Sequence, residues 1–188
     1  IPQIKTKILN EGWASFWHYK ILHELEVPQK FHIPFLKMHN AVVRPHIGGV
    51  NPYHLGFYIF QKIEREKGLD ECFFIREVHD DESALRMYLE EEDMYELNFF
   101  EFQKDQKDRV TRVTEVSDKE GWKHVKKQLI KNTGINSIPL IYVSDFDKKK
   151  KSLELKHEHD GRDLELNYAE QVIKSIKHIW DGEVKLFT

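Results

Sequence analysis

The stretch Asn10-Glu11-Gly12-Trp13-Ala14-Ser15-Phe16-Trp17-His18 decides the fold of the first half, because it is almost wholly apolar around one carboxylate and one imidazole. Seven residues are two helical turns, so Glu11 and His18 share a helix face. Apolar residues occupy nearly every other direction, which is typical of a buried helix. Charge is costly there without a partner. We therefore expect Glu11 to meet a metal ion, His18, or a cation such as Arg44.

The regions around this motif also predict helices in the first half of the chain. The motif helix should end at Val27-Pro28, since a residue before proline avoids helical geometry. Asn51-Pro52 has the residues of a helix start, with Asn as N-cap and Pro at the first helical position. The predicted helices cover roughly 3–25, 34–43, 52–67 and 81–97.

The sequence changes character near Asn98, where alternation typical of strands replaces helical spacing. Two strands joined by a turn at 105–108 precede a helix over about 119–132. Two further strands, a helix over about 167–180 and a closing strand follow. The predicted fold is α+β, with a helical region, 1–97, and a small β-β-α-β-β-α-β domain, 98–188, built on a mainly antiparallel sheet.

Composition narrows the class of protein. The chain has 188 residues, of which 40% are hydrophobic, so it can form one large core or two small ones. A net charge of −3 with both signs interspersed favours no nucleic-acid partner. No apolar run reaches membrane-spanning length, and the single Cys72 fits a reducing, cytoplasmic location. The start at Ile1-Pro2 leads us to expect the C-terminal part of a longer protein.

Several segments together carry a resemblance to a known family. They are the 10–18 motif, Met38-His39 with Val42-Val43, Asn51-Pro52-Tyr53-His54-Leu55-Gly56, Phe74-Ile75-Arg76-Glu77-Val78, and a pattern spread over 153–182. With them the chain resembles the stage V sporulation protein R family over nearly its whole length. The resemblance implies a bacterial cytoplasmic protein that acts in spore cortex formation. It also implies a longer protein, with an N-terminal region that has its own histidine-rich segment.

The motif also suggests a reaction. In thermolysin-like zinc peptidases, a glutamate in an Asn-Glu pair supplies the third ligand, after two histidines from an earlier helix. Asn10-Glu11 is similar to that pair, so we predict a metal-dependent hydrolase whose site is completed outside this chain. The predicted ligands of zinc or another divalent metal are Glu11, His18 and His39. The predicted catalytic residues are Glu11, His18 and Tyr53, with Tyr53 as a donor to an oxyanion.

Each of these predictions has an alternative that involves no catalysis. His39 is otherwise a core or capping histidine, and Tyr53 otherwise packs as an aromatic residue at a helix start. The alternative function is a non-enzymatic docking or regulatory module for an unknown protein partner in spore assembly. Such a module would be sensitive to surface changes in its second half, for example at His157 or Arg162. His157 and His159 also share a strand face, which would permit weak two-point metal binding.

Overall fold

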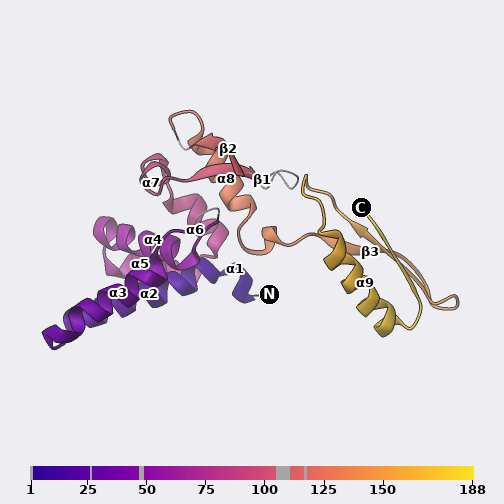
Figure 1. The fold of residues 1–188 in the computed structure, drawn as a ribbon, viewed down its shortest axis with the longest axis horizontal. Coiled ribbons are helices and arrows are strands. Elements are labelled where there is room, and N and C mark those ends of the chain that lie inside the picture. Colours follow the sequence, from indigo (N-terminus) through magenta and orange to yellow (C-terminus); the bar gives the residue numbers. More distant parts are fainter. Residues whose placement is uncertain (1, 26, 47–48, 105–110, 117) are drawn as a thin grey trace. The chain divides into compact units, whose positions relative to one another are not determined.

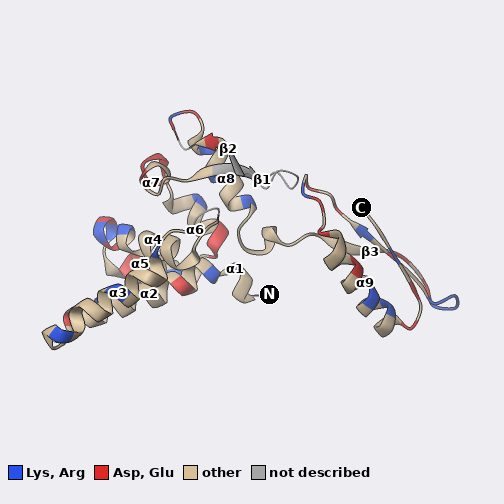
Figure 2. Ribbon diagram, in the orientation of Figure 1, with Lys and Arg blue, Asp and Glu red and all other residues tan. Residues whose placement is uncertain are grey.

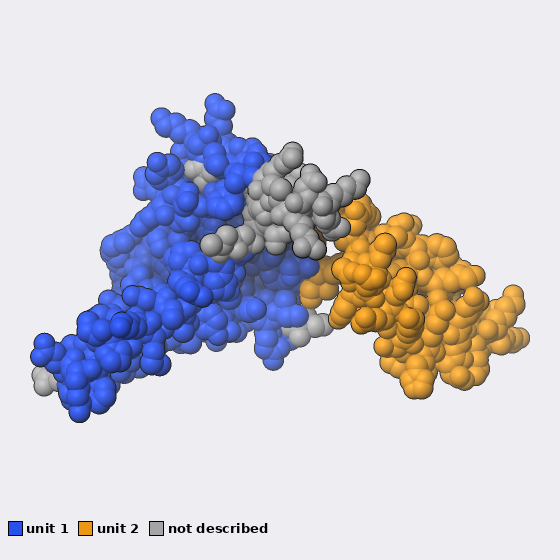
Figure 3. Space-filling view, viewed as in Figure 1, with its two compact units in different colours: residues 1–137 blue, residues 138–188 orange. Residues whose placement is uncertain are grey.

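The computed structural model describes residues 2–25, 27–46, 49–104, 111–116 and 118–188. It divides into two compact units, residues 1–137 and 138–188, coloured separately in Figure 3. Unit 1 is mainly helical, and unit 2 packs one long helix on a small sheet (Figure 1). The predicted α+β class with a helical first half is therefore confirmed. Every helix among the described residues is too short or too polar to cross a membrane.

Unit 1 is built on two long helices that cross, α2 and α4. Its elements are α1 (Pro2–Lys5), α2 (Lys7–Glu24), η1 (Gln29–Phe31), α3 (His32–Val43), α4 (Pro52–Lys67), α5 (Leu69–Val78), α6 (Asp81–Tyr88), α7 (Glu91–Glu96), β1 (Phe100–Lys104), β2 (Thr111–Val116), α8 (Trp122–Lys131) and η2 (Gly134–Ser137). Helix α2 contributes Leu9 and Phe16 to the core, where they meet Ile59 and Phe60 of α4. Burial of such side chains is the main favourable term in folding.

Asn51 ends one helix and begins the next, as its position before Pro52 predicted. Its side-chain oxygen accepts a hydrogen bond from the N–H of Tyr53, at 3.1 Å, which caps α4. Its amide nitrogen donates to the carbonyls of Val42 and Arg44, at 2.7 and 2.8 Å, at the end of α3. One buried side chain thus fixes how α3 joins α4.

The predicted helix over 81–97 is two helices, and an additional helix precedes them. Helix α5, over 69–78, follows Gly68 directly and was not predicted. Helix α6 begins with a capping box in which Asp80 accepts from the N–H of Ser83 at 2.9 Å. A second box at Glu90 starts α7 and interrupts the helix after Tyr88. Each box satisfies backbone N–H groups locally, so two short helices replace one long helix.

The change from helix to strand near Asn98 does not coincide with the division between the units. Strands β1 and β2 pair antiparallel, with Phe100 opposite Val116. They contact α8, and α8 contributes Val125 and Leu129 to the core of unit 1. Residues 98–137 therefore belong to unit 1, whereas our predicted domain boundary followed Leu97. The predicted turn at 105–108 lies outside the described residues.

Unit 2 consists of β3 (Ile141–Asp147), β4 (Ser152–His157), α9 (Leu166–Trp180) and β5 (Glu183–Phe187). The strand order is β3-β4-β5, with β3 antiparallel and β5 parallel to β4. The parallel pair follows from the connection, because a strand–helix–strand crossover returns in the same direction. Leu153, Leu155 and Val184 form its core, covered by side chains of α9 such as Ile173 and Trp180.

Candidate functional site

Two glycines bring the motif helix into backbone contact with α4. A Cβ built on Gly12 would lie 2.3 Å from the carbonyl carbon of Gly56, and one built on Gly56 would lie 2.2 Å from the carbonyl oxygen of Ile8. Only residues without a side chain permit this approach. The close contact of the two helices brings Glu11, next to Gly12, near Tyr53 in the first turn of α4. The interaction of the Tyr53 hydroxyl with the Glu11 carboxylate raises the pKa of Tyr53.

Glu11 lies on the wall of a cavity of about 940 Å³ within unit 1. Its polar lining includes Asn10, Glu11 and Gln128, and its apolar lining includes Ile8 and Leu129. A concave, partly apolar space with a few converging polar groups is the usual form of a small-molecule site. Glu11 gives this wall a carboxylate that can accept a proton.

Asp81, also on the cavity wall, is committed to a structural role. Its two carboxylate oxygens accept hydrogen bonds from the backbone N–H groups of Ile8 and Leu9, at 2.8 and 2.9 Å. It therefore caps α2 from more than seventy residues away in sequence, whereas Asp80 caps its own helix. Burial raises the pKa of the Asp81 carboxyl to about 6, and the two backbone hydrogen bonds only partly offset this rise.

His18 and His39 form a separate cluster, farther along α2. The His39 ring is buried, with its centroid 6.2 Å from that of His18, 5.2 Å from Tyr19 and 4.9 Å from Phe57. Burial lowers the pKa of His39, and the charges of His18 and His23 lower it further. Its Nε2 has no hydrogen-bond partner among the described residues.

The expected burial of the motif helix is wrong at one of its two polar positions. His18 is exposed and Glu11 is only partly buried. The side chain that the structure brings to Glu11 is Tyr53, rather than His18 or Arg44. Tyr53, predicted as a catalytic residue, is therefore brought to Glu11, while His18 is not.

The predicted metal ligands are not assembled in one place. Two turns of helix separate Glu11 from His18 by about 10 Å along the axis, whereas zinc ligands lie about 2 Å from the metal. Among the residues that the structure describes, no group of three or more His, Cys, Asp or Glu side chains is arranged to hold a metal ion. These residues do not fit a complete zinc site, and further ligands would have to come from elsewhere.

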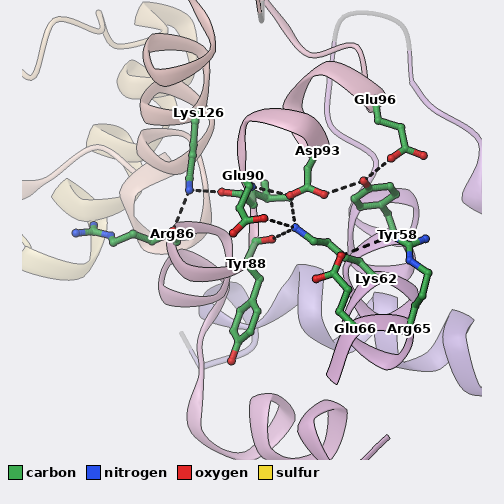
Figure 4. Close-up of polar contacts among 11 residues, drawn as sticks. Tyr58, Lys62, Arg65, Glu66, Arg86, Tyr88, Glu90, Asp93, Glu96 and Lys126 are labelled. Atoms are coloured by element: carbon green, nitrogen blue, oxygen red, sulfur yellow. Dashed lines mark hydrogen bonds and ion pairs between the residues drawn. The ribbon is translucent and has the colours of Figure 1, made fainter. Parts of the chain in front are cut away.

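A buried ion pair, not anticipated from the sequence, joins α4 to α7 (Figure 4). Lys62 donates to Asp93 at 2.6 Å, to the Tyr88 carbonyl at 3.2 Å and to Glu90 at 3.2 Å. Asp93 also accepts from the hydroxyl of Tyr58, at 2.8 Å. Burial lowers the pKa of Lys62, but the hydrogen bond and charge of Asp93 outweigh it, and the pKa lies above its usual value.

This arrangement is structural, because all three protons of the Lys62 ammonium group have acceptors. The acidic run at 90–93 reads as a solvated helix face, yet Asp93 is buried. The signal that could have revealed it is the capping-box position of Asp93, three residues after Glu90. Such a position fixes the carboxylate at a helix start, where the remaining oxygen can face the core.

In unit 2, the rings of the two candidate histidines lie 5.9 Å apart, but their polar partners differ. His157 is buried at the end of β4, and its Nδ1 lies 3.1 Å from the hydroxyl of Thr188. His159 lies beyond the strand, and its Nε2 is 3.2 Å from Asp163. Arg162 pairs with Asp160. These contacts give His157 a packing role and place His159 on the surface.

Comparisons with known proteins agree with the resemblance found in the sequence. Residues 1–138 match the family model described as "SpoVR like protein", and residues 139–188 match "SpoVR-like C-terminal domain". The join of the two matches lies next to the division between the units. The chain is 28% identical to the "Uncharacterized protein YcgB" of Escherichia coli (strain K12), over 98% of this chain and 42% of that relative. The chain thus spans less than half the length of this relative. No solved structure matches.

Proposed function

This chain belongs to the SpoVR family, a membership that points to a sporulation-related protein, and we propose that the protein acts in formation of the spore cortex as a hydrolase. The Glu11–Tyr53 pair would be its acid–base machinery. Glu11 would accept a proton from the attacking water, and Tyr53 would donate a hydrogen bond to the oxyanion that forms. The bond scission would be that of an amide.

The observation that carries this proposal is the Glu11 carboxylate on the wall of the 940 Å³ cavity, with Tyr53 close enough that the carboxylate raises the pKa of its hydroxyl. A carboxylate beside a space for a small molecule, with a phenol near it, provides the groups that general acid–base chemistry uses. The surroundings also support it, since the close contact of Gly12 with Gly56 fixes both residues on rigid helices.

A divalent metal such as zinc remains part of the proposal. Glu11 would hold the metal together with ligands from the part of the family protein that lies outside this chain. When bound, the metal would supply a water of lowered pKa as nucleophile. The pair of His18 and His39 would be a second place for ligands, because burial lowers the pKa of His39 and its Nε2 has no partner in the part of the chain that is described.

The decisive experiment replaces Glu11 in the complete gene product. Glu11→Gln keeps the shape of the side chain and removes its charge, so spores should lack a normal cortex while protein levels and thermal stability stay unchanged. Glu77→Gln, on the exposed side of α5, is the matched control and should have no effect. Metal analysis of the complete protein beside a Glu11→Gln, His18→Ala variant then tests the metal. A normal cortex in Glu11→Gln spores would rule out the hydrolase.

A docking module for another spore-assembly protein is the second candidate, and the surface of unit 2 favours it. Strand β3 is at the edge of the sheet, and its apolar side chains Val143 and Phe146 are both 53% exposed. Edge strands of this kind can pair with a strand of another protein. Replacing Val143 and Phe146 with Lys should then abolish cortex formation while Glu11→Gln does not, which is the reverse of the pattern expected for a hydrolase.

A further inference from the structure

Helix α3 and the end of α2 that it contacts form a surface that is unusually apolar for one exposed to solvent. Of the twelve residues of α3, only His39 is buried. Ile33 is 60% and Met38 is 67% exposed. Figure 2 shows α3 mostly in tan, and Lys37 is the only Lys, Arg, Asp or Glu in its sequence. A helix that is apolar on all sides is normally covered by other protein.

The exposed apolar residues continue beyond α3 into η1 and the end of α2, both of which contact α3. We call this area the α2–α3 surface, and its members are Ile21, Leu25, Phe31, Ile33, Leu36, Met38 and Val42. A groove of about 510 Å³ crosses it, with Leu25, Phe31 and Leu36 among its lining residues. Contiguous exposed apolar patches of this kind mark interaction sites in folded proteins. The groove gives the patch a shape that a helix can fill.

We propose that the α2–α3 surface is the docking site for another segment of the same polypeptide, an amphipathic helix from the part of the family protein outside this chain. The length of the relative supports this occupant, since this chain covers only 42% of it. A segment on the same chain has a high effective concentration, so it can keep an apolar surface covered at all times. A separate partner would leave the surface open whenever it dissociated.

The charges beside the groove indicate which side chains the docking helix should carry. Lys30, whose ammonium lies 4.9 Å from the ring of Phe31, and Lys37 both lie beside the apolar area. The docking helix should therefore carry acidic side chains along the borders of its apolar face. This inference goes beyond the proposed hydrolase and does not require a metal, so each can fail while the other stands.

Thiol labelling tests the proposal, because the natural Cys72 is fully buried and burial raises its pKa to about 11. Met38→Cys places a thiol on the α2–α3 surface. Arg65→Cys is the matched control in unit 1, since the Arg65 side chain is 69% exposed. Both variants are made in the 188-residue chain and in the complete gene product, and circular dichroism checks that each is folded. Maleimide labelling is then followed at protein concentrations from nanomolar to micromolar.

The thiol at position 38 should react rapidly in the 188-residue chain and at least about tenfold more slowly in the complete product, as a docked state populated nine times in ten requires. The control thiol should react equally in both. Equal rates at position 38 would overturn the proposal. Protection that disappears on dilution, or that arises in the 188-residue chain as its concentration rises, would also overturn it and assign the surface to a second copy.

Discussion

The cap that Asp81 makes on α2 predicts an unusual dependence of stability on pH. Asp81 is 1% exposed, and the pKa of its carboxyl in the folded chain is about 6, against an ordinary value of 3.8. The folded state therefore binds this proton more tightly than the unfolded state. Protonation of Asp81 stabilises the fold, so its contribution grows as pH falls through 6 and is lost as pH rises above 6.

The size of the effect follows from the two pKa values. Between pH 7 and pH 5 the folded carboxyl becomes largely protonated while the unfolded one stays ionised, which adds about 1.4 kcal/mol to the free energy of unfolding. Asp81→Asn removes the titration, keeps the shape and leaves one acceptor for the N–H groups of Ile8 and Leu9. The free energy of unfolding of the unsubstituted chain, minus that of the variant, should rise by about this amount from pH 7 to pH 5.

Urea unfolding at a series of pH values measures this difference, with the fluorescence of Trp13 and Trp17 on α2 as the signal. Other titrating groups, such as the buried His39, are present in both proteins and cancel in the difference. Hydrogen exchange at Ile8 and Leu9 checks that the substitution acts at the start of α2. Parallel pH profiles would refute the reasoning, because Asp81 would then titrate at its ordinary value in the folded chain.

Two further substitutions test the packing of unit 1. Gly12→Ala places a methyl group 2.3 Å from the carbonyl carbon of Gly56. Urea unfolding should show that the free energy of unfolding falls by about 1–3 kcal/mol, because this clash outweighs the higher helix propensity of alanine. The control Gly49→Ala, with nothing within 4 Å, should change the free energy of unfolding by less than about 0.5 kcal/mol. Lys62→Met leaves the buried charge of Asp93 without its cation and should lower the free energy of unfolding by about 3–5 kcal/mol. Adding Asp93→Asn should restore part of this loss. Equal stabilities within either set would contradict the corresponding contact.

The sequence predicted the fold where local signals agree with tertiary packing. Asn51-Pro52 has the chemistry of a helix start, and Gly68 has a positive φ of 89° that suits the end of α4. Local signals failed where a side chain serves a distant element. Asp81 reads as a charge at the start of its own helix, yet it caps α2, and nothing within its own neighbourhood in the sequence indicates this.

The candidate site was predicted in part, because helical spacing identifies a face and not a place along it. Residues seven apart face the same side but lie about 10 Å apart along the axis. The face shared by Glu11 and His18 meets α4 at one end and α3 at the other, so each residue acquires a different neighbour, Tyr53 or His39. The sequence motifs identified all four residues as candidates. They did not indicate that Glu11 would lie beside Tyr53 and His18 beside His39.

The contact between Gly12 and Gly56 explains why Glu11 lies beside Tyr53 while His18 lies beside His39. Because the two backbones touch there, α2 and α4 are close at Glu11 and Tyr53, and they stay in contact along α2 as far as the Lys20–Glu64 ion pair. Helix α3 lies along the outer half of α2, which is how His39 comes to lie beside His18. A hydrolase built on this frame would therefore centre its chemistry at the crossing and leave the outer half of α2 to docking. It follows that Glu11→Gln should impair cortex formation without changing thiol protection at position 38, whereas a charge introduced at Ile33 should release that protection first.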